Sequence, residues 1–239
     1  DVIIDGYLPL MHKGQMMSMV NGRSVSRGPG SNNPFTTEFA TGSETIANIL
    51  LLVDSAPADK KPVIQSAIKS WIVDSEGEYD FYANARDFSA LLGAKRIMED
   101  PSIEPASYSG MKVYGSMDRA VQVNDDYTVG LSMYSSRIYN YESINNENIK
   151  GWHQNDGTLY VYNDDLEQYG EGYWPTVDPY RLPGTTTDTR ELSPAAAQGK
   201  KSPQSFVGGA TDGENGTMAM YYNSTNLGLG MDLKARKSW

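Results

Sequence analysis

Two halves of the sequence with different residue patterns meet at residues 101–109, which read PSIEPASYS. Pro101 and Pro105 disfavour helix in the residues that precede them, and several of the other positions hold small polar residues. This composition is typical of a linker between domains. We therefore expect one domain over residues 1–100 and a second over residues 110–239.

Residues 1–100 show the spacing of amphipathic helices. Apolar residues recur every three or four positions over residues 38–53, 59–73 and 82–98. We expect a further helix over about residues 9–20, which contain four methionines. Short helices joined by brief loops predict a helical bundle or layered barrel.

Residues 110–239 show the alternation of strands instead. It covers residues 111–114, 118–123, 127–134 and 158–162, with clusters of Gly, Asn and Asp between them. Short strands with frequent turn residues are typical of antiparallel sheets in a sandwich. Residues 231–239 also have strand character up to the last residue, so we expect the chain to be an internal piece of a longer polypeptide.

Composition excludes several classes of protein. The net charge of −10 argues against a nucleic-acid partner, which requires a basic face. It also disfavours long-range steering of a polyanion, which would have to be held by a few local arginines. The absence of cysteine excludes disulfides and thiolate sites. No apolar run reaches the roughly 20 residues of a membrane span, and any signal peptide would lie upstream.

A first candidate site is the pair Arg23 and Arg27. If the preceding helix continues, residues four apart share a face, and two guanidinium groups can hold one carboxylate or sulfate. Alternatively, the two cations interact only with the dipole at a solvated helix end.

Two further segments are candidates for contact with sugars. Residues 135–148 combine Arg, Tyr, Glu and Asn, which suits a sugar-facing loop or an ordinary polar connection. Residues 172–186 contain three prolines within nine residues, which predicts a rigid, extended excursion without strand character. That excursion either presents Trp174 as a platform for a sugar ring or covers the edge of a sheet.

The sequence indicates no metal site. His12 and His153 are the only histidines, and neither has ligand spacing to another candidate residue. Residues 163–165 (NDD) resemble part of a calcium loop but lack the remainder of the pattern. We therefore expect no cofactor, and calcium is not supported.

Four stretches together resemble polysaccharide lyase family 8, which contains hyaluronate, chondroitin AC and xanthan lyases. They are residues 21–27 (NGRSVSR), 145–153 (NNENIKGWH), 173–186 (YWPTVDPYRLPGTT) and 233–239 (LKARKSW). The resemblance implies the end of an incomplete α/α toroid followed by the first part of an antiparallel β supersandwich. It also implies a secreted enzyme that cleaves uronic-acid-containing polysaccharides by β-elimination.

The resemblance also implies roles for particular residues. Arg23 and Arg27 match arginines that hold a catalytic tyrosine and the substrate, and Glu142 matches a glutamate that orients these groups. Asn145 matches an asparagine of the same loop, and Trp174 is the expected sugar platform. The family's central Asn, His and Tyr have no counterpart in residues 1–20, so we expect the remainder of the parent polypeptide to supply them. The alternative is a non-catalytic carbohydrate-binding or structural β module.

Overall fold

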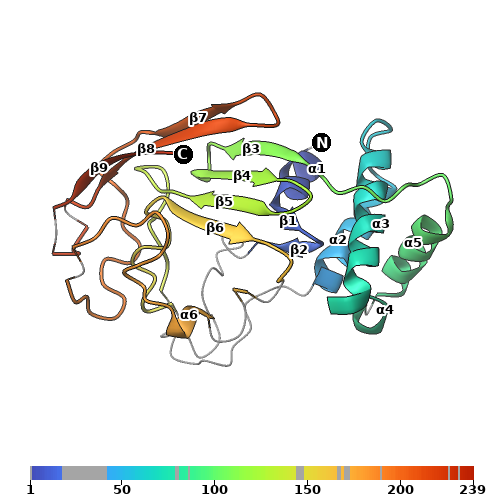
Figure 1. The fold of residues 1–239 in the computed structure, drawn as a ribbon, viewed down its shortest axis with the longest axis horizontal. Coiled ribbons are helices and arrows are strands. Elements are labelled where there is room, and N and C mark those ends of the chain that lie inside the picture. Colours follow the sequence, from blue (N-terminus) through green and yellow to red (C-terminus); the bar gives the residue numbers. More distant parts are fainter. Residues whose placement is uncertain are drawn as a thin grey trace. The chain divides into compact units, whose positions relative to one another are not determined.

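The chain divides into two compact units. One consists of Asp1–Met17, Phe39–Gly110 and Val123–Tyr127, and the other of Ser18–Glu38, Met111–Gln122 and Thr128–Trp239. The computed structural model describes residues 2–17, 42–78, 81–85, 87–143, 148–165, 168–169, 173–188, 190–225, 227–230 and 232–239. Among these residues the first unit is mainly helical and the second contains antiparallel sheets, as predicted (Figure 1).

Two long helices of the first unit agree with the helical spacing of the sequence. They are α2 (Gly42–Val53) and α3 (Lys61–Glu78); residues 38–41 of the first predicted helix lie outside the described residues. The buried side chains that join these helices to their neighbours are apolar. They include Ile46, Leu50, Val53, Ile64, Ala67, Ile68, Trp71, Ile72, Phe81, Ala90, Ala94 and Ile97. In the part of the chain described, no helix has both the length and the apolar character to cross a membrane.

The single helix predicted over residues 82–98 is wrong, because two helices occupy this segment. They are α4 (Phe81–Asn84) and α5 (Phe88–Glu99). Asp87 lies between them in an extended conformation, and its side chain accepts a hydrogen bond of 3.0 Å from the backbone N–H of Ala90. Asp87 is therefore the N-cap of α5, a role that its carboxylate suits well.

The helix predicted over residues 9–20 is also wrong where the structure describes it. Helix α1 (Val2–Tyr7) leads through the 3₁₀ turn η1 (Leu8–Leu10) into a hairpin of β1 (Met11–His12) and β2 (Gln15–Met16). Lys13 and Gly14 connect the two strands with φ angles of 47° and 83°. Two successive residues with positive φ are typical of the two-residue hairpin turn that matches the twist of the strands. A helix cannot accommodate these φ values.

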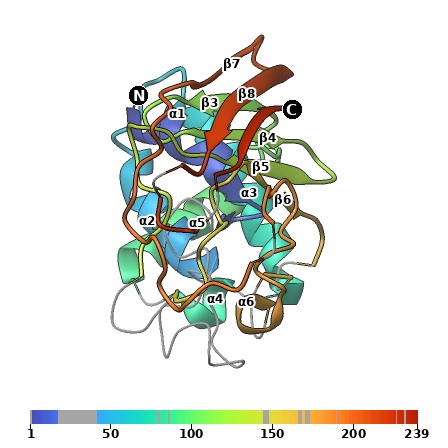
Figure 2. The ribbon, with the colours of Figure 1, turned by 90° about the vertical axis from the view of Figure 1, so that its left-hand side faces the viewer.

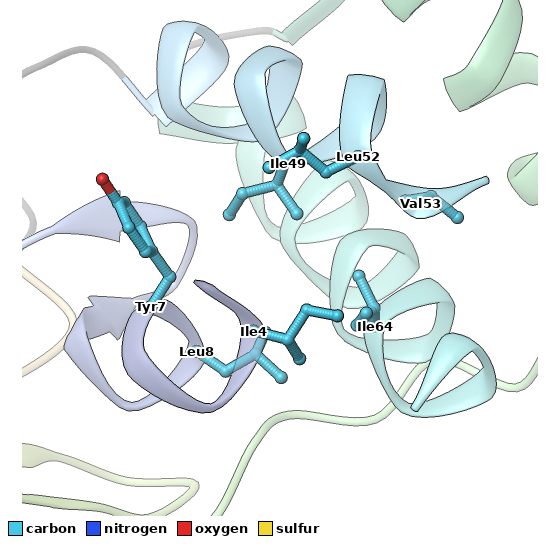
Figure 3. Close-up of a pocket in the computed structure, with 7 residues that line it drawn as sticks. All are labelled: Ile4, Tyr7, Leu8, Ile49, Leu52, Val53 and Ile64. Atoms are coloured by element: carbon cyan, nitrogen blue, oxygen red, sulfur yellow. The ribbon is translucent and has the colours of Figure 1, made fainter. Parts of the chain in front are cut away.

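An apolar pocket in the helical unit is too small for a sugar. Its lining includes Ile4, Tyr7, Ile49 and Ile64, and Figure 3 shows Ile4 and Ile64 pointing toward one another. The volume is about 20 Å³, which is roughly the space of one water molecule. This pocket therefore represents a packing gap of the helical core.

The second unit contains two antiparallel sheets. The four-stranded sheet has the order β3-β4-β5-β6, and the three-stranded sheet has the order β7-β8-β9 (Figures 1 and 2). The strands are β3 (Gly110–Tyr114), β4 (Arg119–Val123), β5 (Thr128–Ser132), β6 (Thr158–Tyr162), β7 (Val207–Thr211), β8 (Gly216–Asn223) and β9 (Lys234–Ser238). The strands predicted at 111–114, 118–123, 127–134, 158–162 and 231–239 are thus confirmed, with small differences at their ends.

Alternation along β8 shows how the second unit buries its core. Met218, Met220 and Tyr222 are buried, whereas Thr217 and Tyr221 are exposed. Because successive side chains of a strand point to opposite faces, one face of the β7-β8-β9 sheet packs inward and the other remains open. The buried face belongs to a core that also includes Ala120, Leu131, Met133, Tyr134, Tyr141 and Trp152.

Candidate active site

Glu142 lies on the connection between β5 and β6, whose first residues are held by buried hydrogen bonds. Asn140 is 2% exposed; its backbone N–H donates to the Lys200 oxygen at 2.8 Å, and its Oδ1 accepts from the Lys200 N–H at 2.9 Å. Tyr141 is also buried, and its hydroxyl donates to the Ala196 oxygen. The chain entering Glu142 is therefore fixed to residues 195–200, while Glu142 itself is exposed.

Asn148, further along the same connection, holds the main chain of Glu142. Its Nδ2 donates to the main-chain oxygen of Glu142 at 2.8 Å and to Oε1 of Gln154 at 3.1 Å. Nε2 of Gln154 returns a hydrogen bond of 3.0 Å to Oδ1 of Asn148. Asn148 has a φ of 52°, a conformation that asparagine tolerates better than most residues. The segment that carries Glu142 is therefore a loop closed by a buried pair of amides.

Gly151 permits this arrangement because it leaves no side chain between its neighbours. A Cβ at this position would lie 2.5 Å from Cδ2 of Tyr141 and 2.6 Å from Oδ1 of Asn148. Contacts this short are not found between real side chains. The close approach of Tyr141 to the Asn148 amide therefore requires glycine here.

A partly buried arginine links the connection between β5 and β6 to the strands. Nη1 of Arg119 donates to the Met133 oxygen at 2.6 Å, and Nη2 donates to Oδ1 of Asn155 at 3.0 Å. Asn155 also accepts from the Ser132 hydroxyl and donates to the Asn140 oxygen. Burial lowers the pKa of Arg119 to about 10, so this guanidinium stays charged at neutral pH.

A second arginine fixes the start of the loop. Nε of Arg137 donates to Oδ1 of the fully buried Asp118 at 3.1 Å, and Nη2 donates to the same oxygen. Nη1 of Arg137 donates to the Ser205 oxygen at 2.9 Å and Nη2 to the Val207 oxygen at 3.1 Å. Arg137 is therefore occupied by protein oxygens, and its role is structural.

His153 is a structural residue as well. It is fully buried, and its Nδ1 lies 2.6 Å from Oδ2 of Asp156. The main-chain oxygen of His153 accepts a hydrogen bond of 2.7 Å from the hydroxyl of Thr158 at the start of β6. Within the described part of the chain, no group of three or more His, Asp or Glu side chains could hold a metal ion.

Residues 168–169 and 173–184 cover the edge strand β6. The backbone N–H of Leu159 donates to the Pro183 oxygen at 3.0 Å, and that of Val161 donates to the Tyr169 hydroxyl at 3.0 Å. These contacts satisfy groups of an edge strand that would otherwise be open to another chain. Gly184 has a φ of 86°, and a Cβ there would lie 2.1 Å from the Gly157 oxygen, so this segment also depends on a glycine.

The extended conformation predicted for residues 172–186 is wrong over its first part. Tyr173–Thr176 forms the single helical turn α6, because Pro175 falls in a first turn, where no backbone N–H is needed. The Tyr173 and Tyr169 rings are 5.0 Å apart and nearly perpendicular, and burial raises the pKa of Tyr173 to about 12. The edge-cover interpretation is therefore supported.

The predicted site residues are only partly within the described chain. Glu142 is described, but Arg23, Arg27 and Asn145 lie outside the described residues. Trp174 belongs to α6, and its side chain also lies outside the description. The meeting of the two arginines with Glu142 therefore stays a prediction. Asn148, Gln154 and Asn155 were not predicted as site residues, although the asparagine-rich run 145–148 was a signal.

Known proteins similar to this chain are polysaccharide lyases. A 50% identical relative, the polysaccharide lyase 8 family protein HylA of Enterococcus faecalis, is matched over 100% of this chain and 17% of its own length. The hyaluronate lyase HylB of the same organism is 41% identical over 98% of this chain and 23% of its own length. The chain thus spans less than a quarter of these relatives.

A solved structure and two family models agree with these relatives. The chondroitin AC lyase of Streptomyces coelicolor, solved with chondroitin sulphate, has a TM-score of 0.80 and 32% identity over 100% of this chain and 33% of that one. The model of the N-terminal alpha-helical domain of polysaccharide lyase family 8 matches residues 1–70, and the super-sandwich domain model matches residues 109–239. The chain belongs to polysaccharide lyase family 8.

Proposed function

We propose that the chain is part of a lyase that cleaves uronic-acid-containing polysaccharides by β-elimination. Membership of the family supports this proposal, because its two domain models match in the predicted order. The observation that carries it furthest is the position of Glu142, an exposed acidic residue on a loop closed by the Asn148 side chain. A carboxylate held in this way would orient the arginines that neutralise the negative charge of the transition state.

The proposed domain boundaries follow the change in residue pattern. Residues 1–100 would form the last part of an incomplete α/α toroid, residues 101–109 the linker, and residues 110–239 the first part of the β supersandwich. The helical and antiparallel character of the two described parts supports this assignment.

The reaction begins with removal of the proton at C5 of the uronate. The electron pair of the C5–H bond forms the C4=C5 double bond. The bond between C4 and the glycosidic oxygen then breaks, and an acid protonates the departing oxygen. Negative charge accumulates on the uronate carboxylate before the bond breaks. Groups that neutralise this carboxylate therefore stabilise the transition state more than the ground state.

Residues of this chain would position the catalytic groups and the substrate for this reaction. We assign Arg23 and Arg27 to holding a catalytic tyrosine and the substrate, since a nearby guanidinium favours the phenolate that acts as base. Glu142 would orient the arginines, and Asn145 and Trp174 would contact the sugar. The central Asn, His and Tyr would come from a part of the polypeptide outside residues 1–239.

We also propose that the enzyme acts outside the cell. Hyaluronan, chondroitin and xanthan are polymers too large to enter a bacterium intact, so their cleavage requires a secreted protein. Which of these polymers is cut depends on pocket contacts that residues 1–239 do not fully provide.

The proposal is tested by assaying this 239-residue chain and a longer polypeptide that contains it. The ultraviolet absorbance of the unsaturated uronate product should rise with the longer protein and stay constant with the chain alone. Arg23→Ala should abolish turnover by the longer protein, whereas Arg96→Ala, at an exposed arginine of α5, should preserve it. Turnover by the isolated chain would refute the prediction that the catalytic Asn, His and Tyr lie outside residues 1–239. A longer protein that binds polysaccharide without cleaving it would favour the non-catalytic module.

A further inference from the structure

The open face of the β7-β8-β9 sheet carries a row of two aromatic rings and a guanidinium group. The backbone N–H of Tyr221 donates to the Phe206 oxygen at 3.0 Å, which places Phe206 beside Tyr221 just before β7 begins. In the register of β8 and β9, Tyr221 lies opposite Arg236. The three side chains therefore follow one another across the sheet, perpendicular to its strands.

The aromatic members of this row are open to solvent although they contact each other. Phe206 is 47% exposed and Tyr221 is 41% exposed. Their ring centroids are 4.7 Å apart with an angle of 38° between the ring planes, and the Arg236 guanidinium lies 5.5 Å from the Tyr221 centroid. Tyr221 thus holds a cation on one side and a second ring on the other, which preorganises the row.

Two exposed cations follow one another along β9, and the exposed Asp232 lies two residues before the first of them. Lys234 and Arg236 are both exposed, and residues two apart on a strand share a face and lie roughly 7 Å from each other. Among the described residues, neither cation lies in an ion pair within 4.0 Å. In a chain with a net charge of −10, two neighbouring exposed cations form a local exception.

A groove of about 340 Å³ runs along this face. Gln204, Asn223, Lys234 and Arg236 contribute to its lining, and none of the described lining residues is acidic. Small residues form the adjacent row, because Gly208 lies opposite Ala219 and Ala219 lies opposite Ser238. The floor beside the rings is therefore flat, and amide groups border it.

We propose that this face binds an acidic polysaccharide chain through the row Phe206–Tyr221–Arg236. The apolar C–H face of a sugar ring would stack on the two aromatic rings. The Arg236 guanidinium would form paired hydrogen bonds to a uronate carboxylate, and Lys234 would contact the next negative group along the chain. The amide of Gln204 would bond to a sugar hydroxyl, whereas Asn223, whose Oδ1 accepts from the Thr225 N–H at 2.9 Å, would offer only its Nδ2. The ligand is the substrate class of the proposed function, on which this inference rests.

Affinity electrophoresis of the full 239-residue chain tests the proposal. Gels that contain hyaluronan should retard the chain, and gels that contain neutral dextran should not. Arg236→Gln and Tyr221→Ala should each weaken binding to hyaluronan by about tenfold, the effect of one lost charge-assisted contact or stacked ring. Tyr221→Phe should preserve binding because it keeps the ring.

Lys112→Gln is the matched control, since Lys112 lies over the Tyr114 ring of β3 at 5.8 Å, in a similar cation–ring pair elsewhere. It should leave hyaluronan binding unchanged. Equal losses in Lys112→Gln and Arg236→Gln would overturn the proposal, because the effect would then be one of net charge. Undiminished binding in both groove variants, with circular dichroism matching the unchanged chain, would also overturn it, as would equal retardation by dextran.

Turnover by a longer polypeptide that contains the chain separates this inference from the proposed function. Arg236→Gln should raise KM for the polymer and leave kcat unchanged, which is the signature of lost binding that does not involve the transition state. If the longer protein has no lyase activity but Arg236→Gln still weakens hyaluronan binding by the chain, the proposed function is wrong and the proposed binding face is supported. If the longer protein is an active lyase and Arg236→Gln leaves hyaluronan binding unchanged, only the proposed binding face is rejected.

Discussion

The side-chain amide of Asn148 donates a hydrogen bond of 2.8 Å to the main-chain oxygen of Glu142, six residues earlier in the chain. Because Asn148 is 6% exposed, water cannot readily replace this donor. The bond therefore fixes the position of the Glu142 main chain relative to the strands. It connects a buried hydrogen-bond network to the residue proposed to orient the catalytic groups.

Asn148→Ala should lower stability and turnover together. It removes the donor to the buried Gln154 side chain and to the main-chain oxygen of Glu142, and it places alanine at a φ of 52°, which together should cost about 2–4 kcal/mol of unfolding free energy. In a longer polypeptide that has lyase activity, kcat should fall more than KM rises, because Glu142 would be misplaced for the transition state. Urea unfolding and steady-state kinetics measure the two effects.

Lys150→Ala is the control for this variant, because Lys150 is exposed in the same connection. It should change the unfolding free energy by less than about 0.5 kcal/mol. A stable Asn148→Ala protein with unchanged kcat would show that the loop does not depend on this amide.

Arg119→Lys should destabilise the second unit although it conserves charge. Arg119 reaches the Met133 oxygen and the Asn155 side chain with different nitrogens, and a lysine has one nitrogen in place of this fork. A buried acceptor left without its donor costs about 1–3 kcal/mol. Arg96→Lys, at an exposed arginine of α5, should be neutral in the same thermal-unfolding experiment. Equal melting temperatures for the two variants would contradict the bridging role of Arg119.

Local patterns in the sequence were enough to predict most elements. The spacing of Ile46, Leu50 and Val53 predicted α2, and the alternation in residues 158–162 predicted β6, because each pattern reflects burial on one face. The hairpin of β1 and β2 was missed because methionines on both sides of Lys13 and Gly14 also fit helical spacing. Two residues with positive φ decided the structure there.

The candidate site was less predictable than the fold. The loop containing Glu142 could be selected by composition, but the pairing of Asn148 with Gln154 depends on a left-handed residue that no local pattern specifies. Arg119 looked like any strand residue, since the two partners that it bridges, Met133 and Asn155, lie 14 and 36 positions away. Long-range hydrogen bonds of this kind follow from the tertiary fold and not from spacing.

Gly184→Ala should release the segment that covers β6. The new Cβ would meet the Gly157 oxygen at 2.1 Å, and the φ of 86° would be strained for alanine. We expect a loss of at least about 1–3 kcal/mol in unfolding free energy and faster aggregation, because the Leu159 N–H would lose its acceptor at the sheet edge. Gly115→Ala should be nearly neutral, since nothing lies within 4 Å of a Cβ there. Light scattering that shows equal aggregation of the two variants would contradict the edge-cover role.

Lys237 should make stability rise with pH in the mildly alkaline range. Burial lowers the pKa of Lys237 to about 8 from its usual 10.5, an effect that the negative charge of Asp156 only partly offsets. Between these two values the unfolded chain binds more protons than the folded protein, so the free energy of unfolding increases with pH. The increase between pH 8 and pH 10 should be about 2 kcal/mol, measured by urea unfolding at each pH.

Lys237→Met should remove this increase, whatever its effect on stability at neutral pH. Nζ of Lys237 also donates to the main-chain oxygens of Asp156 and Gly184, so the variant starts from a lower stability, and only the slope with pH is diagnostic. Lys234→Met, at an exposed lysine of the same strand, should keep the slope. Above pH 10 the free energy of unfolding should fall in all three proteins, because burial raises the pKa of Tyr173 to about 12 and that of Tyr141 further. The unfolded chain then releases protons that the folded protein retains, and stability falls as pH rises. A slope that persists in Lys237→Met would assign the titration to another group.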